Sequence, residues 1–263
     1  MHFAANLSMM FQEHPFLDRF AAAKCAGFDQ VEYLFPYEWR GEDIAKRLDD
    51  HSLQQVLFNL DPGDWDAGER GLACLPGREE EFQATVSQAL KYAEVLSCRR
   101  LHAMAGIQPP DIDPEVCRAT YIENISLAAK RCREAGVSLL IEPINPTDIP
   151  GFFLNDFAMA MNVIDEIGAE VGAQYAPKLL FDIYHCAKIH SNVTDWIETC
   201  REVTAHYQIA GIPDRHEPDE GTLALSDMLA AVEKVHPELT IGCEYRPKGE
   251  TTAGLGWIER ARQ

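Results

Sequence analysis

The chain has 263 residues, of which 46% are hydrophobic and 25% charged, a composition typical of one large globular domain. Its 42 acidic and 23 basic residues give a formal net charge of −19, which argues against nucleic acid or an anionic membrane as a partner. There is no apolar run of about 18 residues that would cross a membrane, and no signal-peptide pattern at the start. The eight cysteines include no CxxC pair, which indicates reduced thiols and a cytoplasmic location.

Apolar strand-like segments alternate with helical segments along the whole chain. The predicted strands cover residues 3–10, 30–35, 54–60, 99–106, 137–144, 178–184, 205–210 and 239–246. The predicted helices cover residues 15–26, 42–51, 78–96, 113–134, 155–167, 194–203, 226–235 and 256–262. Residues typical of helix ends support these boundaries: Asp113 and Pro114 suit a helix start, and Gly27 and Gly136 suit helix ends.

Eight strand–helix alternations predict a parallel (β/α)₈ barrel, a TIM barrel of the α/β class, rather than an open doubly wound sheet. The strands read as continuous apolar runs, as expected when both faces of a parallel sheet are covered. There is no linker or fixed-period repeat, so residues 1–263 are predicted to form a single domain. The Gly- and Pro-rich loop 61–77, which contains Trp65, is long enough to suggest a functional role such as a lid.

The last four predicted strands each end in an oxygen-bearing side chain, namely Glu142, Asp182, Gln208 and Glu244. Taken singly, a strand-end glutamate is usually a helix-cap partner or a rim residue, and Gln208 alone would be structural. Barrel active sites, however, are built at the carboxyl ends of the strands, and charges beside buried strands need partners. The coincidence of four predicts one divalent-cation site. An all-oxygen set suits Mg²⁺ or Mn²⁺ rather than structural zinc, and both metals remain open.

Three further polar residues flank these strand ends and are candidate substrate-binding residues. His185 follows Asp182 by three positions, and Arg215 lies just beyond the seventh predicted strand. The planar fork of arginine suits a carboxylate or the hydroxyls of a small anionic substrate. His102 ends the fourth strand and fits a buried core histidine equally well.

Two glutamates at one metal site indicate a reaction type. A cation that binds a carbonyl and a neighbouring hydroxyl acidifies the adjacent C–H bond by stabilising an enediolate. One of Glu142 and Glu244 then takes a proton from one carbon, and the other returns a proton to the neighbouring carbon. That sequence of steps is an isomerisation of the aldose–ketose type, whereas return to the same carbon is epimerisation. The sequence does not say which glutamate acts first.

Several of these segments resemble a known family. IEPIN (141–145), FDIYH (181–185), YQIAGIPDRHEP (207–218) and EYRP (244–247) are similar to signature segments of the hydroxypyruvate isomerase family, within the xylose-isomerase-like barrels. The opening residues 3–37 also resemble that family, so the resemblance covers essentially the whole chain.

The resemblance implies roles for individual residues. It implies Glu142 and Glu244 as the proton-transfer residues, these two with Asp182 and Gln208 as metal ligands, and His185 and Arg215 as substrate contacts. Gln208 stands where related ketose 3-epimerases have a histidine. Family members convert hydroxypyruvate to tartronate semialdehyde, and a close branch isomerises 2-oxo-tetronates. Both substrates carry a carboxylate, and the shared motifs leave the choice between them open.

Three alternative functions remain. A ketose 3-epimerase would use the same site. A metal-dependent abasic-site endonuclease needs several strand-end histidines and a basic surface, which the oxygen ligands and the charge of −19 disfavour. A non-catalytic sugar-acid-binding barrel is compatible with the composition, although two carboxylates at a metal site would be unusual in a mere binder. The oligomeric state is open, with a homodimer or higher homo-oligomer expected by analogy.

Overall fold

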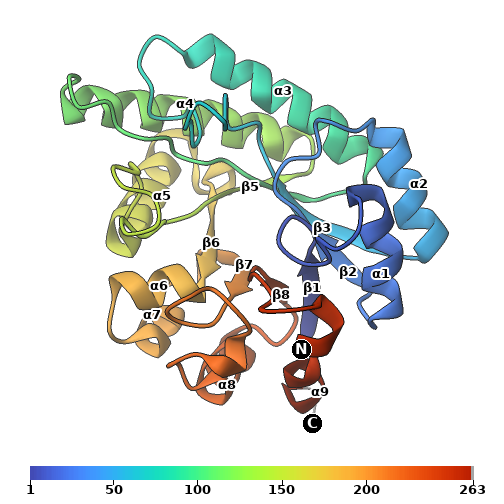
Figure 1. Ribbon diagram of the computed structural model, residues 1–263. Helices are drawn as coiled ribbons and strands as arrows, with labels where there is room; N and C mark the ends of the chain where they lie inside the picture. Colours follow the sequence, from blue (N-terminus) through green and yellow to red (C-terminus); the bar gives the residue numbers. More distant parts are fainter. Residues whose placement is uncertain (262–263) are drawn as a thin grey trace. The chain divides into compact units, whose positions relative to one another are not determined.

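The computed structural model describes residues 1–261. Strands and helices alternate along the chain (Figure 1). The strands are β1 (His2–Asn6), β2 (Gln30–Glu32), β3 (Gln54–Asn59), β4 (Arg100–His102), β5 (Ser138–Ile141), β6 (Lys178–Asp182), β7 (Thr204–Ile209) and β8 (Thr240–Cys243). The α-helices are α1 (Arg19–Cys25), α2 (Gly41–His51), α3 (Glu79–Val95), α4 (Pro114–Glu134), α5 (Phe157–Val171), α6 (Ile183–Ile189), α7 (Val193–Thr199), α8 (Leu225–Val235) and α9 (Gly256–Ala261).

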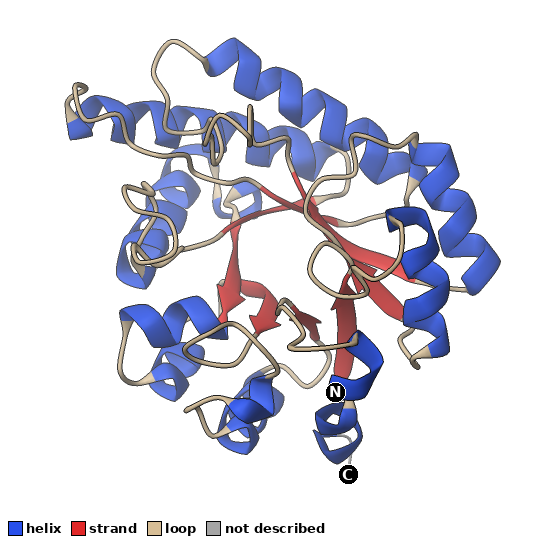
Figure 2. Ribbon diagram, viewed as in Figure 1, coloured by secondary structure: helices blue, strands red, loops and turns tan. Residues whose placement is uncertain are grey.

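The strands, drawn in red in Figure 2, follow the order β1 to β8 in one sheet that closes into a barrel. The pairs β1–β2, β3–β4, β4–β5, β5–β6 and β7–β8 are parallel, and β1 also pairs in parallel with β8. The predicted parallel (β/α)₈ barrel is therefore confirmed.

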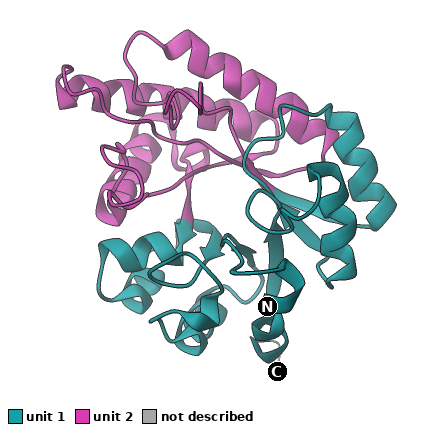
Figure 3. Ribbon diagram, in the orientation of Figure 1, with its two compact units in different colours: residues 1–56, 181–263 teal, residues 57–180 magenta. Residues whose placement is uncertain are grey.

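Two compact units divide the barrel (Figure 3). Unit 1, in teal, takes residues 1–56 and the chain from residue 181 onwards, whereas unit 2, in magenta, takes residues 57–180. The boundaries fall inside β3 and β6, so each of these strands contributes residues to both units. A single domain over the whole chain stays a prediction.

The core of unit 1 is rich in edge-to-face aromatic pairs. The Phe16 ring lies 5.5 Å from that of Phe20 and 5.3 Å from that of Tyr33, in both cases nearly perpendicular. Phe3 in β1 meets Trp257 in α9 in the same way at 5.2 Å. Such pairs stabilise beyond the area they bury. They fix β1 and β2, which carry polar residues of the site, against the surrounding helices.

In unit 2, α4 is a long helix that packs against α3, β5 and α5. Its start was predicted from the sequence: the Asp113 side chain accepts the N–H of Glu115 at 2.9 Å, and Pro114 occupies the first turn. Gly136 follows its end with a φ of +72°. No helix within residues 1–261 combines the length and the apolar character that a bilayer crossing requires.

The sixth strand is shorter than predicted. Residues 178–184 were expected to be strand, but the chain turns into α6 immediately after Asp182. The carboxylate of Asp182 accepts the N–H of Tyr184 at 2.8 Å and so caps the new helix. An apolar run of this kind does not distinguish a strand from a helix start, and the expectation for Ile183 and Tyr184 was wrong.

Other boundaries also differ from the prediction, and β1, β2, β4, β5 and β8 each end three or four residues before the predicted strand ends. The predicted helix 15–26 is a 3₁₀ turn, Phe16–Asp18, followed by α1, and the predicted helix 194–203 ends earlier, as α7. The last predicted helix corresponds to α9, and its expected final residue, Arg262, lies outside the described residues.

The loop 61–77 has an anchored part and an exposed part. A Cβ added at Gly71, whose φ is +108°, would collide with the backbone of Met104 just after β4. The N–H of Cys74 donates to the carbonyl of Ala105 at 2.8 Å. Trp65, by contrast, is 39% exposed. The base of the loop is therefore held against the segment after β4, and a lid role for the exposed part stays a prediction.

Candidate active site

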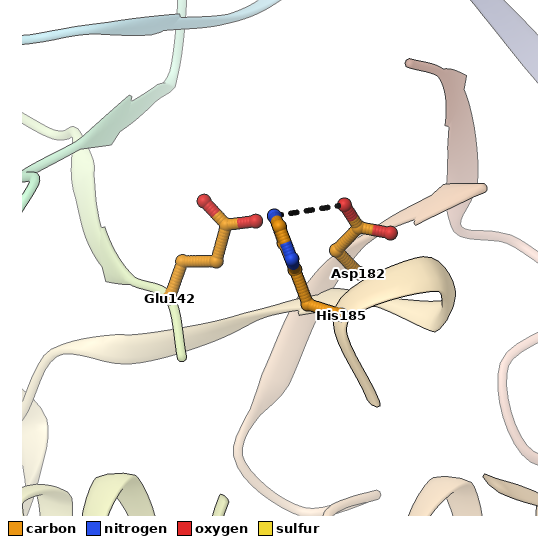
Figure 4. Close-up of side chains that lie close together, drawn as sticks. All are labelled: Glu142, Asp182 and His185. Carbon is orange, nitrogen blue, oxygen red and sulfur yellow. Dashed lines mark ion pairs between the residues drawn. The ribbon is translucent and has the colours of Figure 1, made fainter. Parts of the chain in front are cut away.

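Asp182 ends β6 and lies fully buried at the start of α6. One carboxylate oxygen, Oδ1, caps the helix, which leaves Oδ2 to face other side chains. The Nε2 atom of His185, in the first turn of α6, lies 3.6 Å from Oδ2, and Figure 4 marks this pair with a dashed line. Both side chains belong to a cluster that could hold a metal ion. The helix cap thus places the predicted ligand and its neighbouring histidine side by side.

Glu244 follows the last residue of β8 and is also buried. Arg215 donates from Nη2 to Glu244 Oε2 at 2.6 Å and to Asp182 Oδ2 at 3.2 Å. Arg215 has a left-handed backbone, with φ of +59°, and its guanidinium lies over the Tyr184 ring at 4.9 Å. The turn after β7 therefore directs one arginine onto two predicted metal ligands.

Arg215 compensates the buried carboxyl groups of Asp182 and Glu244 only in part. Burial raises the pKa of Glu244 to about 8, an effect that Arg215 opposes and that the nearby carboxylates of Asp182 and Glu32 reinforce. Burial likewise raises the pKa of Asp182 to about 6, again against the pull of Arg215. Each carboxyl group is held away from its charged form because one guanidinium does not balance the buried acids. A divalent cation would supply the missing charge.

Gln208 lies near the end of β7 and is 3% exposed. Its Nε2 donates to Glu32 Oε1 at 2.8 Å, whereas its Oε1 is buried and has no hydrogen-bond partner among residues 1–261. A buried carbonyl oxygen without a donor is costly unless something binds it. The Gln208 amide and the Asp182 and Glu244 carboxylates each offer an oxygen donor, the ligand type that suits Mg²⁺ or Mn²⁺.

Unit 2 holds the other predicted residues, Glu142 and His102. Glu142 follows the last residue of β5 (Figure 4), and His102 ends the neighbouring strand β4. His102 Nε2 lies 3.6 Å from Glu142 Oε2. Burial lowers the pKa of His102 to about 3, so the imidazole is neutral and this contact is not an ion pair. His102 therefore offers a polar but uncharged side chain beside one of the two predicted acid–base glutamates.

The structure adds Asn6, Glu32 and His206, which the sequence did not single out. All three are buried; Glu32 accepts a hydrogen bond from Asn6, and His206 Nε2 lies 2.6 Å from Glu32 Oε2. Asn6 Nδ2 also reaches Glu244 Oε1 at 3.5 Å. Two signals were present: Glu32 is a charge within an apolar strand, and His206 shares a strand face with Gln208 by the two-residue period.

Comparisons with known proteins agree along nearly the full length. The family model described as xylose isomerase-like TIM barrel matches residues 20–261. The chain is 49% identical over 257 residues to the 2-oxo-tetronate isomerase of Cupriavidus necator, with 98% of this chain and 97% of that protein covered. It is 38% identical over 262 residues to the hydroxypyruvate isomerase of Escherichia coli, with 100% of both covered.

A solved structure gives a similarly close match. The crystal structure described as an AP endonuclease, family 2, from Brucella melitensis has a TM-score of 0.94 at 43% identity, over 98% of each chain. With the closed parallel barrel and the strand-end oxygens, these matches show that the chain belongs to the xylose isomerase-like TIM barrel family.

Proposed function

We propose that this chain is a divalent-cation-dependent isomerase that interconverts a 2-oxo-tetronate and its 3-oxo isomer, with hydroxypyruvate as the second candidate substrate. The class of activity follows from the relatives: with 38–49% identity to such enzymes over nearly its whole length, the chain is an isomerase. The 2-oxo-tetronate is favoured because the relative with 49% identity acts on it, whereas the hydroxypyruvate isomerase has 38%.

The observation that carries this proposal is the buried oxygen set of Asp182, Gln208 and Glu244. Two of these groups are acids that burial disfavours in their charged form, and the third is an oxygen without a donor. Glu142, which follows β5, would complete the set, because side chains at the carboxyl ends of barrel strands converge. A bound cation would polarise the substrate carbonyl and make the neighbouring C–H bond more acidic.

The proton transfers fall to Glu142 and Glu244. One carboxylate removes the proton from C3 of the 2-oxo substrate, and the other delivers a proton to C2. The hydroxyl proton moves from the oxygen on C3 to the oxygen on C2, so the isomer has the same atoms as the substrate.

The substrate carboxylate would be bound by positively charged or donor side chains. Arg215 and His185 are the candidates from unit 1, and both already contact Asp182. His102 would add a neutral polar contact beside Glu142. Arginine is well suited to a carboxylate, since its planar fork donates two parallel hydrogen bonds.

The test is proton NMR in D₂O with the metal-stripped protein. A 2-oxo-tetronate and hydroxypyruvate are supplied separately, before and after addition of Mn²⁺ at trace level or of Mg²⁺. The proposal predicts metal-dependent formation of the isomer with deuterium on the carbon that receives the proton, faster for the 2-oxo-tetronate. Deuterium exchange that inverts the same carbon without isomer formation would instead indicate an epimerase. No turnover or exchange with either substrate would contradict the proposal and favour a binding protein.

The description of the Brucella melitensis structure makes a nuclease the second candidate. A net charge of −19 disfavours it, because DNA binding draws its affinity from basic side chains on phosphates. Incubation of the Zn²⁺-loaded protein with a duplex that contains one abasic site decides the question. Strand cleavage at that site, lost in Glu244→Gln, would replace the isomerase proposal.

A further inference from the structure

Glu32, at the end of β2, is fully buried and is hydrogen-bonded to three side chains. Gln208 Nε2 donates to Oε1 at 2.8 Å, and Asn6 Nδ2 donates to the same oxygen at 3.0 Å. His206 Nε2 lies 2.6 Å from Oε2. A carboxylate buried to this extent is tolerated only with such donors. Glu32 is thus the common acceptor of a polar network built on β1, β2 and β7.

The backbone of β8 leaves space for this carboxylate. Gly242 is the register partner of Gln208 on β7 and of Ala4 on β1. A Cβ added at Gly242 would collide with both carboxylate oxygens of Glu32. Gly242 also precedes Glu244 by two residues. The Glu32 side chain therefore extends from β2 to β8, the strand that Glu244 follows.

The acceptor character of Glu32 determines how the Gln208 amide is oriented. A side-chain amide has a donor end and an acceptor end of almost equal size, and only its partners decide between the two orientations. Glu32 Oε1 accepts from the Nε2 end at 2.8 Å. The Oε1 end is then directed away from Glu32 and is left buried without a hydrogen-bond partner within residues 1–261.

We infer that Glu32 is a positioning residue that holds the amide oxygen of Gln208 ready for the divalent cation. This inference rests on the cation site of the proposed function. Glu32 acts through Gln208, since its own carboxylate oxygens are occupied by donors from three residues. Removal of such an orienting partner typically weakens metal affinity by about 10- to 100-fold.

Asn6 links the same network to Glu244. Its Oδ1 accepts the N–H of Ser8 at 3.1 Å, which fixes Nδ2 as the donor end toward Glu32. The same Nδ2 reaches Glu244 Oε1 at 3.5 Å. The orientation of both amides, Asn6 and Gln208, thus depends on one buried acceptor.

A double-mutant cycle on the full chain tests the inference. Calorimetry measures Mn²⁺ binding to the native protein and to Glu32→Asp, Gln208→Ala and the double variant. Glu32→Asp keeps the charge but shortens the side chain, so a purely electrostatic role predicts native affinity. The inference predicts affinity about 10-fold weaker in Glu32→Asp, and the double variant within about twofold of Gln208→Ala, because Glu32 no longer has an amide to orient. Native affinity in Glu32→Asp, or losses that multiply in the double variant, would overturn it.

The cycle separates this inference from the function on which it rests. If the native protein binds no Mn²⁺, the cation site and the positioning role both fail. If Gln208→Ala weakens binding but Glu32→Asp does not, only the positioning role fails.

A second measurement observes the native protein and uses a variant only to assign the signal. The side-chain amide of Gln208 is observed by NMR in protein labelled with ¹⁵N-glutamine and is assigned by its absence in Gln208→Ala. The inference predicts Nε2 hydrogens that exchange slowly with solvent, with or without Mg²⁺, and a signal that moves when Mg²⁺ binds. Fast exchange, or an unmoved signal while calorimetry records Mg²⁺ binding, would contradict it.

Discussion

Arg215 donates a 2.6 Å hydrogen bond from Nη2 to Oε2 of Glu244, and the same nitrogen lies 3.2 Å from Oδ2 of Asp182. One guanidinium thus serves two buried carboxylates. The two acids still have pKa values raised by burial, to about 8 and about 6, so the single positive charge compensates them only in part. Arg215 and a divalent cation would supply the same thing, positive charge beside these oxygens.

Arg215→Met is expected to destabilise the protein in EDTA by roughly 3 kcal/mol, because it leaves two buried carboxyl groups without the guanidinium that binds them. Saturating Mn²⁺ should recover most of this loss, since the cation replaces the missing charge. Urea unfolding with EDTA and with Mn²⁺ measures both values. Arg246→Met, which removes an exposed arginine, is the control and should match the native protein. Equal destabilisation of Arg215→Met in the two conditions would contradict the shared-charge account.

Glu142→Gln and Glu244→Gln are each expected to lower kcat by about 10²- to 10⁴-fold, because amides do not transfer protons at neutral pH. The fold should persist, since glutamine retains the shape of the side chain. Turnover is followed by NMR, with circular dichroism as the check on folding. Glu134→Gln, at the exposed end of α4, should keep native kcat. A near-native kcat in either site variant would disprove the two-glutamate scheme.

Glu244 also predicts how stability depends on pH in EDTA. Burial is the main cause of its raised pKa, about 8 when folded, against about 4.3 in an unfolded chain. A raised pKa means that the folded protein binds the proton more tightly, so this stabilisation is complete below about pH 4 and is lost as the pH rises toward 8. Glutamine does not titrate. Glu244→Gln should therefore gain stability relative to the native protein between pH 5 and about 8, as measured by urea midpoints. A constant difference would show that the pKa is not raised.

The sequence predicted the barrel because its signals are local. Apolar runs alternate with capped helices, as with Asp113 before α4, and each signal lies within a few residues. The strand-end positions of Glu142, Asp182 and Glu244 were predicted for the same reason. The end of β6 was not, because the residues after Asp182 are apolar and the switch to α6 depends on a side-chain cap.

Contacts between residues that are far apart in the chain could not be predicted from the sequence. Arg215 was predicted as a substrate contact, and the structure adds its hydrogen bonds to Asp182 and Glu244, which lie 33 and 29 positions away. The partners of Glu32 could not be predicted, because His206 and Gln208 are more than 170 positions further on. A residue type at a strand end predicts a donor atom, whereas the partner that orients it is fixed only by strand register.

Gly242→Ala tests whether Glu32 needs the space that the glycine at position 242 leaves. A methyl group at this position would collide with the Glu32 carboxylate, which is enclosed by donors and cannot move aside freely. Overpacking of this kind typically costs about 1–3 kcal/mol. Displacement of Glu32 should also free the Gln208 amide, so Mn²⁺ affinity should fall along with stability.

Gly249→Ala is the matched control, because a Cβ at Gly249 meets no atom within 4 Å. It should retain native stability and native Mn²⁺ affinity in urea unfolding and calorimetry. If Gly242→Ala is destabilised but binds Mn²⁺ as tightly as Gly249→Ala, the collision is real but Glu32 does not govern the Gln208 amide. If stability and Mn²⁺ affinity fall in Gly242→Ala but not in Gly249→Ala, the absence of a side chain at position 242 of β8 is needed to orient Gln208 on β7.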